Sequence, residues 1–525
     1  MKIKYLKYLL FAMGILITSC KEDYLDTVKE DSYTSQNYWQ TTDQAKMYVT
    51  SCYNYIRDEW WKTFLTCATD DSYSWSDWPS DIRLLGNGTA TASSGTINHF
   101  WSYYYQAIAT ANIVHDNIGS VPNMDETLRK RLDGEARFFR DYAYQQLIGL
   151  YGDVPLIDHL QKISEFKAAK TPKADVVKFI VNDIDAYSAN LPLSYADASD
   201  QGRVTRGAAL ALKARVLLYD GQWVEAAKAA KAVMDLGVYS IDPNYSSLFD
   251  GTNESSKEII LAGQYVPTSK SSLATWVGGP YVGGWSQVVP TQALVDAYEC
   301  TDGKTIDQSP LYNPQHPYDN RDPRLKMTIV VPGSVVNGIT IDVTNPTSPY
   351  RLGQNNASYT AYYYKKYTPA VIDGSWDGNS TNDIIVLRYA EVLLTYAEAK
   401  IEANDIDASV YNAINQVRQR ASVNQPPISS GKSQTELRSI VRRERRIEFA
   451  IEEQRLFDIR RWKIAENVMP GDLHGIFNNF DNKRADFGKN VLVETRIFNP
   501  ARDYVWGYPQ GEVDLNKNLV QNPKW

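Results

Sequence analysis

Residues 435–466 contain neither glycine nor proline and are rich in strong helix formers, which predicts one long helix. On a helical projection its apolar side chains lie on several sides, so we expect the helix to be buried all round. Four charged residues then lie inside the protein: Glu444, Glu448, Arg455 and Asp458. Because an unpaired buried charge is costly, the pattern predicts an internal network of ion pairs. The alternative is a solvated amphipathic helix whose charges are interleaved by chance.

The chain is long enough to bury a large core. Its 525 residues, 43% of them hydrophobic, can form one large domain or two closely packed ones. A formal net charge of −7 argues against a nucleic-acid partner, which requires a basic face. The 36 tyrosines and 13 tryptophans, against 14 phenylalanines, favour rings that pack with one face and stack or hydrogen-bond at a surface with the other.

The N-terminus has the pattern of an export signal. A lysine-rich start precedes an apolar run at residues 8–17, which is too short to span a bilayer. The run leads to Ile-Thr-Ser-Cys20, which resembles the bacterial lipobox, whose cysteine is lipidated; an ordinary signal peptide that contains a cysteine is the alternative. Residues 21–23 resemble the signal that directs lipoproteins of the Bacteroidota to the outer face of the outer membrane. We therefore expect a signal peptide at residues 1–19 and a lipidated tether at residues 20–35.

The other cysteines, Cys52, Cys67 and Cys300, match no metal-ligand spacing. A disulfide between Cys52 and Cys67 and buried free thiols are both compatible with an exported protein. The five histidines are scattered and lack a His-Glu-x-x-His pair. We therefore expect no metal site and no cofactor.

Helical patterns account for much of the chain, and two of them predict hairpins. Residues 205–236 predict two helices with small residues at their contact and a turn at residues 220–222. Their Leu-Tyr-x-Gly-x-Trp-x-Glu-Ala run resembles a tetratricopeptide hairpin. Residues 387–420 predict a second, looser hairpin with its turn at residues 404–405. Further helices are predicted at residues 35–61, 97–118, 126–151, 173–189 and 291–298.

The remaining sequence is rich in glycine, proline, serine, asparagine and aspartate. Residues 70–96 lack a sustained period and predict a long loop, residues 239–382 a loop-rich part, and residues 467–525 an irregular wrapping tail. Short strands are predicted at residues 259–263 and 327–331. The expected fold class is all-α, mainly helical: an irregular tetratricopeptide-like array of helical hairpins with long loops and a few short β-strands.

Seven blocks of sequence resemble the SusD/RagB family and occur in the family's order. They include RRERRIEFAIEEQRLFDIRRWK at residues 442–463 and the closing YPQGEVDLNKNLVQNP at residues 508–523. The other blocks lie at residues 134–157, 203–223, 288–299, 320–325 and 387–400. In one departure, Glu453-Gln454 replaces the glycine of the family's usual Glu-Gly-x-Arg.

The resemblance implies a surface lipoprotein with a helical, tetratricopeptide-containing fold that binds oligosaccharides or other nutrients. Such proteins cap a TonB-dependent transporter of the SusC type and open and close over its lumen as a lid. The resemblance further implies that the hairpins face the transporter and that variable loops contact the ligand. We accordingly expect a single domain at residues 36–525, with helical hairpins at 36–238, a ligand-facing, loop-rich part at 239–382, and helices with a wrapping tail at 383–525.

The loop at residues 70–96 carries the first candidates for a glycan site. A sugar presents an apolar face and a rim of hydroxyls, so its site needs an exposed flat ring beside hydrogen-bonding side chains. Trp75 and Trp78 are the candidate rings, and Asp71 and Arg83 are their candidate polar partners. Second candidates, from the central loops, are Trp276, Tyr281 and Trp376. For each tryptophan the alternative is a ring packed onto the scaffold, which we favour for Trp285.

The sequence contains no catalytic motif that we recognise. It lacks a Gly-x-Ser-x-Gly elbow, a phosphate-binding loop and a glycine-rich dinucleotide turn. Its 62 carboxylates still leave room for a glycosidase acid/base pair, which needs only the right spacing in three dimensions. We expect a non-catalytic lid that captures oligosaccharides or polysaccharides. The alternatives are a surface glycosidase on a helical scaffold and a lid with a peptide cargo.

Overall fold

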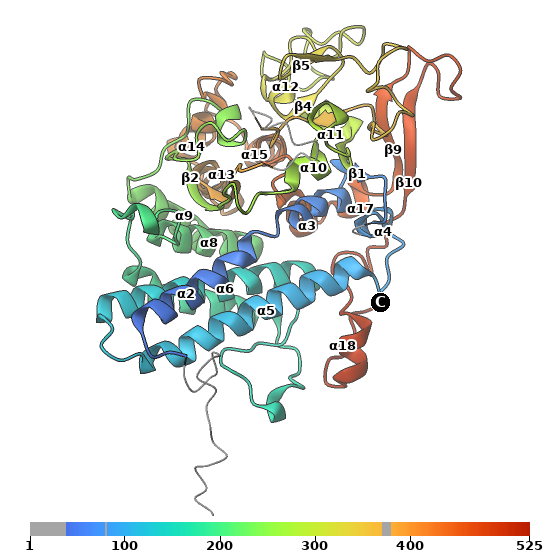
Figure 1. Cartoon of the computed structure of the whole chain (residues 1–525). Coiled ribbons are helices and arrows are strands. Elements are labelled where there is room, and N and C mark those ends of the chain that lie inside the picture. Colours follow the sequence, from blue (N-terminus) through green and yellow to red (C-terminus); the bar gives the residue numbers. More distant parts are fainter. Residues whose placement is uncertain (1–37, 79–80, 370–379) are drawn as a thin grey trace, which may run out of the picture.

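The computed structural model describes residues 38–78, 81–369 and 380–525 (Figure 1). The predicted signal peptide, Cys20, the tether at residues 20–35 and Trp376 lie outside the described residues. The described chain is mainly helical, and its short strands pair two by two, which confirms the predicted fold class. None of the helices in these ranges is long and apolar enough to cross a membrane.

A layer of helices along one side of the molecule consists of α2 (Thr42–Cys52), α5 (Gly95–Asn117), α6 (Glu126–Tyr151) and α7 (Lys173–Tyr187) (Figure 1). α5 and α6 pack along each other, and α2 and α7 flank them. α6 begins at Asp125, whose side chain accepts a hydrogen bond from the Leu128 amide at 2.8 Å. It ends at Gly152, whose φ of 78° takes the backbone out of the helix. These helices confirm the predictions for this part of the chain, except that the helix predicted at 35–61 is interrupted before α3 (Glu59–Phe64).

The two predicted hairpins are confirmed as α8 (Arg206–Tyr219) with α9 (Trp223–Asp235), and α13 (Tyr389–Glu402) with α14 (Ala408–Arg418). Gly221 joins α8 and α9 with a φ of 78°, a conformation that glycine adopts without strain. Small residues such as Ala226 and Ala230 are buried on α9. α13 packs against both α8 and α9, so the two hairpins form one helical array.

The prediction of a single helix at residues 435–466 is wrong, because the structure divides the stretch into α15 (Gln434–Glu448), α16 (Gln454–Arg461) and α17 (Ala465–Val468). The Glu448 carbonyl accepts hydrogen bonds from the Tyr245 hydroxyl at 2.9 Å and from Arg388 Nη2 at 3.0 Å. In a continuing helix this carbonyl would accept from the backbone amide four residues later. Side-chain donors take the place of that amide, so the helix ends here. Ile451 and Glu453 then adopt left-handed φ values of 62° and 68°, which a continuous right-handed helix excludes.

The buried charges of α15 form the predicted network of ion pairs. Glu448 accepts hydrogen bonds from Arg324 and Arg388, both at 2.7 Å, and from Arg420 at 3.0 Å. Glu444 also accepts one from Arg324, at 2.6 Å. Burial alone would raise the pKa of Glu448, but the three guanidiniums outweigh it and hold the pKa far below its ordinary value. α15 lies between α13 on one side and the loop-rich part on the other, so the network ties the two together (Figure 1).

Asp458 is buried and Arg455 is nearly buried, and both form ion pairs, as predicted. Arg455 donates two hydrogen bonds to Asp70, at 2.9 and 2.8 Å. Asp458 accepts hydrogen bonds from Arg445 at 3.0 Å and from Arg461 at 2.9 Å. The contact with Asp70 links α16 to the segment that carries Trp75 and Trp78.

Glu453, at the break between α15 and α16, lies near Lys62, Arg215, Asp58 and Glu452. Burial raises its pKa to about 7, although Lys62 and Arg215 oppose the shift. In the unfolded chain a glutamate ionises near pH 4.3, so the fold favours the neutral form. The resulting contribution to stability is full below about pH 4 and is lost as the pH rises through about 7.

We therefore expect the free energy of unfolding of the wild type to fall by about 1–3 kcal/mol, relative to Glu453→Gln, between about pH 5 and about pH 8. The glutamine keeps the size of the side chain but does not ionise. Urea unfolding of both proteins at each pH measures the difference. The same pH dependence in both proteins would show that Glu453 does not titrate in this range.

Short elements correct the predictions for the loop-rich parts. The predicted loop at 70–96 contains β1 (Ser72–Ser74) and α4 (Ile82–Asn87). The predicted irregular tail contains a hairpin of β9 (Gly471–Phe477) and β10 (Asn490–Arg496), followed by α18 (Gln510–Leu515). β1 pairs with β3 (Val288–Pro290), more than two hundred residues away, so no local pattern could reveal it.

The strand predicted at 259–263 is confirmed as β2 (Ile259–Gly263), which pairs with β8 (Ile384–Arg388). In the predicted strand at 327–331, only β4 (Ile329–Val330) is extended, and it pairs with β7 (Tyr363–Tyr364). The helix predicted at 291–298 is confirmed as α11 (Gln292–Ala297). The remaining elements of this part are α10 (Leu273–Val277), α12 (Arg324–Thr328), β5 (Ser334–Val336) and β6 (Ile339–Ile341).

Cys52, Cys67 and Cys300 are buried free thiols, so the Cys52–Cys67 disulfide does not form. Burial raises the pKa of the Cys52 thiol to about 12. A thiol of this kind stays protonated and unreactive at neutral pH.

Candidate functional site

Aromatic side chains from three separate segments meet on the loop-rich side of the molecule. Trp75 and Trp78 follow β1, Trp276 and Trp285 lie on and after α10, and Tyr359 precedes β7. Trp78 is 65% exposed and Tyr359 is 52% exposed, whereas the other three rings are half-buried. We call these five residues the aromatic surface.

The five rings form two connected groups. Tyr359 stacks on Trp75, with 6.1 Å between the ring centroids and 18° between the planes. Trp276 contacts Trp78 at 6.1 Å and Trp285 at 5.1 Å. The Trp75 Nε1–H donates to the Trp285 carbonyl at 3.4 Å and joins the groups. The arrangement therefore offers a nearly parallel stacked pair beside an exposed tryptophan.

Backbone hydrogen bonds hold the rings in place. The Trp285 amide donates to the Thr275 carbonyl and the Gln287 amide to the Trp276 carbonyl, both at 2.8 Å. These bonds close the loop that carries Trp276 and Trp285. The ring of Phe64, on α3, packs edge-on against Trp276 at 6.2 Å. A surface held in this way loses little conformational entropy when a ligand binds.

Hydrogen-bonding side chains border the aromatic surface. Gln287 donates through Nε2 to the Trp78 carbonyl, which also accepts from Ser76 Oγ at 2.8 Å. The half-buried guanidinium of Arg83 lies 2.7 Å from Glu494 and 3.9 Å from the half-exposed carboxylate of Asp77. Charged groups at this edge can donate to and accept from ligand hydroxyls.

Three of the predicted ring residues, Trp75, Trp78 and Trp276, belong to the aromatic surface, and Arg83 borders it. Asp71 does not. It is 1% exposed, and its carboxylate lies 2.6 Å from Arg446 Nη2. Its acidic side chain is therefore committed to an internal ion pair, and we leave it out of the proposed site.

Tyr281 is also buried, with 6% of its surface exposed. Its ring packs edge-on against Tyr350 at 5.8 Å and Tyr363 at 5.5 Å. We leave it out of the proposed site for the same reason. Trp376, the last of the predicted ring residues, lies outside the described residues.

Tyr359, Asp77 and the buried Gln287, which holds the Trp78 carbonyl, are not among the predicted residues, and for Trp285 packing onto the scaffold is the favoured alternative. Tyr359 begins the run YTAYYY at residues 359–364, whose other tyrosines are buried. A tyrosine-rich run in a turn-rich segment was a usable signal for Tyr359. Nothing local distinguishes Gln287, because its role depends on the position of Trp78.

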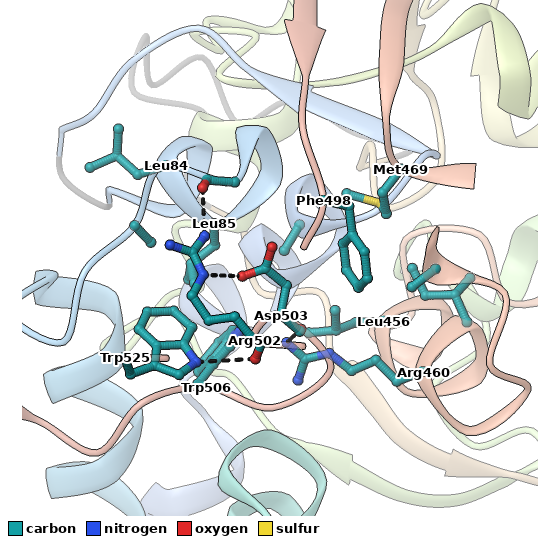
Figure 2. A pocket seen from close by; sticks show the side chains of 15 residues that line it. Leu84, Leu85, Leu456, Arg460, Met469, Phe498, Arg502, Asp503, Trp506 and Trp525 are labelled. Carbon is teal, nitrogen blue, oxygen red and sulfur yellow. Dashed lines mark hydrogen bonds and ion pairs between the residues drawn. The ribbon is translucent and has the colours of Figure 1, made fainter. Parts of the chain in front are cut away.

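A separate cavity lies between α16 and the C-terminal segment (Figure 2). Its volume is about 20 Å³, which admits about one water molecule and no sugar. Arg460 lines it, with the guanidinium 5.4 Å from the Trp506 ring, and burial lowers the Arg460 pKa to about 10. Trp525 donates through Nε1 to the Arg502 carbonyl at 3.1 Å, which packs the chain end against this cavity. Its size and lining indicate a packing defect of the scaffold.

The described residues offer no metal centre: within 38–78, 81–369 and 380–525, no group of three or more His, Cys, Asp or Glu is placed to hold an ion. The candidate site thus consists of rings and hydrogen-bonding groups.

Comparison with known protein families shows to which family this chain belongs. The model of the SusD family matches residues 248–525, more than half of the chain. The chain belongs to the SusD family. A second family model, described as starch-binding associating with outer membrane, matches residues 23–218. The resemblance drawn from the seven sequence blocks is confirmed.

Individual SusD-like proteins match over most of their length. A solved SusD-like carbohydrate-binding protein from Bacteroides fragilis is 30% identical, covers 92% of this chain and 100% of its own, and has a TM-score of 0.85. SusD-like protein P2 of Formosa agariphila is 28% identical over a match of 463 positions that covers 84% of this chain and 83% of its own. A laminarin-binding SusD-like protein is 22% identical, with a TM-score of 0.71 over 93% of this chain and 100% of its own, and shares the fold.

Proposed function

We propose that this SusD-family protein captures oligosaccharides at the cell surface and delivers them, as a lid, to a TonB-dependent transporter of the SusC type. The aromatic surface carries the proposal, because it presents Trp75, Tyr359 and Trp78 beside hydrogen-bonding groups. The relative from Bacteroides fragilis, named as carbohydrate-binding, supports a sugar as the ligand. The family description that mentions starch and the outer membrane supports both the ligand class and the location.

The chemistry of the surface fits a sugar better than a peptide. The ring of Trp78 is 65% exposed and can stack on the C–H face of a pyranose, and the Trp75–Tyr359 pair offers a second ring for the next sugar unit. Asp77 and Arg83 can then bond the hydroxyls at the rim. Because the surface is open, we expect weak binding to single sugars and tighter binding to longer chains.

Calorimetric titration with a panel of polysaccharides, oligosaccharides and peptides tests the ligand class. At least one glycan is expected to bind, and its longer oligomers are expected to bind more tightly than its monosaccharide. Binding of peptides with no binding of any glycan would replace the proposed cargo by a peptide.

The proposed role needs no catalytic step. Asp70 and Asp71, the carboxylates that lead into β1, are paired with Arg455 and Arg446, whereas a glycosidase needs two carboxyl groups facing the same bond. Incubation with the same panel should therefore release no new reducing ends. Reducing ends that accumulate in proportion to the protein, and not with a heat-denatured control, would show an enzyme.

The proposed anchor is a lipid on Cys20, and the proposed partner is the transporter. In the native host, Cys20→Ala should abolish labelling by a fatty acid and release the protein from the outer membrane. A tagged wild-type chain should co-purify with a TonB-dependent transporter. A wild-type chain that carries no lipid, or that brings down no transporter, would contradict the respective proposal.

A further inference from the structure

The loop between α6 and α7 exposes apolar side chains that the fold does not use. Leu160, Ile163 and Phe166 are 50%, 86% and 61% exposed. Val154 and Thr171 pair through backbone hydrogen bonds of 3.2 and 2.9 Å and close the loop at its base. Large apolar side chains gathered on one closed surface loop indicate an interaction site.

Polar contacts hold the loop in the shape that exposes these side chains. The Leu160 amide donates to the Asp116 carboxylate, at the end of α5, at 2.7 Å. Glu165 accepts from the Lys162 amide at 2.7 Å, and its carboxylate lies 3.2 Å from His159 Nε2. Ile163 lies between Lys162 and Glu165 in the sequence, at the tip of the turn that these bonds close. The bonds therefore fix the loop in a conformation that exposes the Ile163 side chain.

The C-terminal segment extends the same surface. Asn516 and Asn518 donate through their side-chain amides to the carbonyls of Ala168 and Lys167, at 2.8 and 2.7 Å. These bonds bring Leu515 and Val520, which are 74% and 66% exposed, to the side of the loop. In Figure 1 the loop and α18 both project below the layer of long helices, whereas β1 and α10 lie above it. We call the following residues the apolar patch: Leu160, Ile163, Phe166, Leu515 and Val520.

Lysines alternate with the apolar side chains of the loop. Lys162 precedes Ile163 and Lys167 follows Phe166, and both lysines are exposed. Neither forms an ion pair with any carboxylate of the described residues. Lys162, Lys167 and Lys170 balance the three acids of the loop, Asp153, Asp158 and Glu165. Apolar side chains flanked by exposed lysines match an interface that is apolar inside and carries phosphates at its surface.

The start of the described chain is compatible with such an interface. Tyr38 precedes α2, and α2 belongs to the layer of long helices. The apolar patch projects from the same layer. At roughly 3.4 Å per residue, the number of residues between Cys20 and Tyr38 sets an upper limit of about 60 Å on the distance from the layer to a surface that holds Cys20.

We propose that the apolar patch rests on a phosphate-bearing lipid surface, with Ile163 and Phe166 entering it and Lys162 and Lys167 pairing with phosphates. The side chains of the patch protrude from the loop and from the C-terminal segment, which fits insertion into a fluid surface. The orientation toward the membrane rests on the proposed lipid anchor and puts the patch on lipid beside the transporter that the helical hairpins are expected to face. The affinity for lipid does not rest on the anchor.

The test uses a chain that begins at Lys21, which lacks Cys20 and keeps every described residue. Flotation with vesicles of phosphatidylcholine, with and without phosphatidylglycerol, measures its binding. The wild type should float with the vesicles that contain phosphatidylglycerol, and Ile163→Ser/Phe166→Ser should bind at least about tenfold more weakly. Lys162→Glu/Lys167→Glu should lose the preference for phosphatidylglycerol. Val224→Ser, at a 56% exposed position on α9, is the matched control and should bind as the wild type does.

Two results would overturn the inference. A wild type that floats with neither vesicle would assign the patch to a protein partner. A serine variant that floats as well as the wild type would show that the patch does not carry the binding. Because the tested chain has no lipid and the vesicles carry no glycan, either result leaves the proposed anchor and the proposed glycan site to their own tests.

Discussion

Replacing Glu448 by glutamine is expected to lower the free energy of unfolding by about 3–5 kcal/mol. Glu448 is fully buried and accepts hydrogen bonds from three guanidiniums, those of Arg324, Arg388 and Arg420. Glutamine has nearly the same shape but no charge, so three cations lose their shared anion in a fully buried site. Unfolding in guanidinium chloride, followed by tryptophan fluorescence, measures the loss.

The matched control for this substitution is Glu225→Gln on α9. Glu225 forms a solvent-exposed pair with Lys228 at 2.7 Å, and exposed pairs contribute little to stability. The control should therefore unfold at the same denaturant concentration as the wild type. Equal effects of the two substitutions would contradict the view that the buried network stabilises the fold.

Arg455→Met is expected to destabilise the protein by about 3 kcal/mol while glycan binding by the folded fraction survives. Arg455 donates two hydrogen bonds to Asp70, whose pKa would rise on burial alone but is held below its ordinary value by Arg446 and Arg455. The cost lies at the low end for a buried pair because Arg446, whose Nη2 lies 2.8 Å from Asp70, remains as a partner of Asp70 in the variant. Denaturant unfolding gives the loss of stability, and calorimetry of the native protein gives the affinity.

A second substitution separates loss of a charge partner from loss of packing. If the unpaired Asp70 carboxylate causes the destabilisation, Asp70→Asn/Arg455→Met should recover part of the stability lost in Arg455→Met. No recovery would indicate that the arginine acts through its packing. Loss of glycan binding with unchanged stability would contradict the scaffold role and place Arg455 in the binding site.

The helical framework could be predicted because its signals are local. For the hairpin of α8 and α9, the spacing of small residues predicts where the two helices touch, and Gly221 predicts the turn between them. The burial of Glu444 and Glu448 followed from apolar residues on several sides of their helix. The break after Glu448 could not be predicted, because it depends on donors from Tyr245 and Arg388, which are distant in the sequence.

The candidate site could be predicted only in part, for the same reason. Trp75 and Trp78 stood out because their segment has no apolar neighbours to cover them. Tyr281 and Asp71 lie in segments of similar composition, yet contacts with Tyr363 and Arg446 bury them. Which side of a loop faces solvent is decided by the elements that it packs against, and the local sequence does not contain that information.

The glycan affinity of Trp75→Ala/Trp78→Ala tests the central claim most directly. The wild type and the variant are titrated calorimetrically with the glycan that binds the wild type most tightly. Phe166→Ala serves as the control, because Phe166 is 61% exposed and lies on the loop between α6 and α7, which carries none of the five rings of the aromatic surface. We predict that the variant binds at least about tenfold more weakly, a loss of about 1.4 kcal/mol or more, while the control binds as the wild type does. An unchanged affinity in the tryptophan variant would contradict the assignment of glycan binding to the aromatic surface.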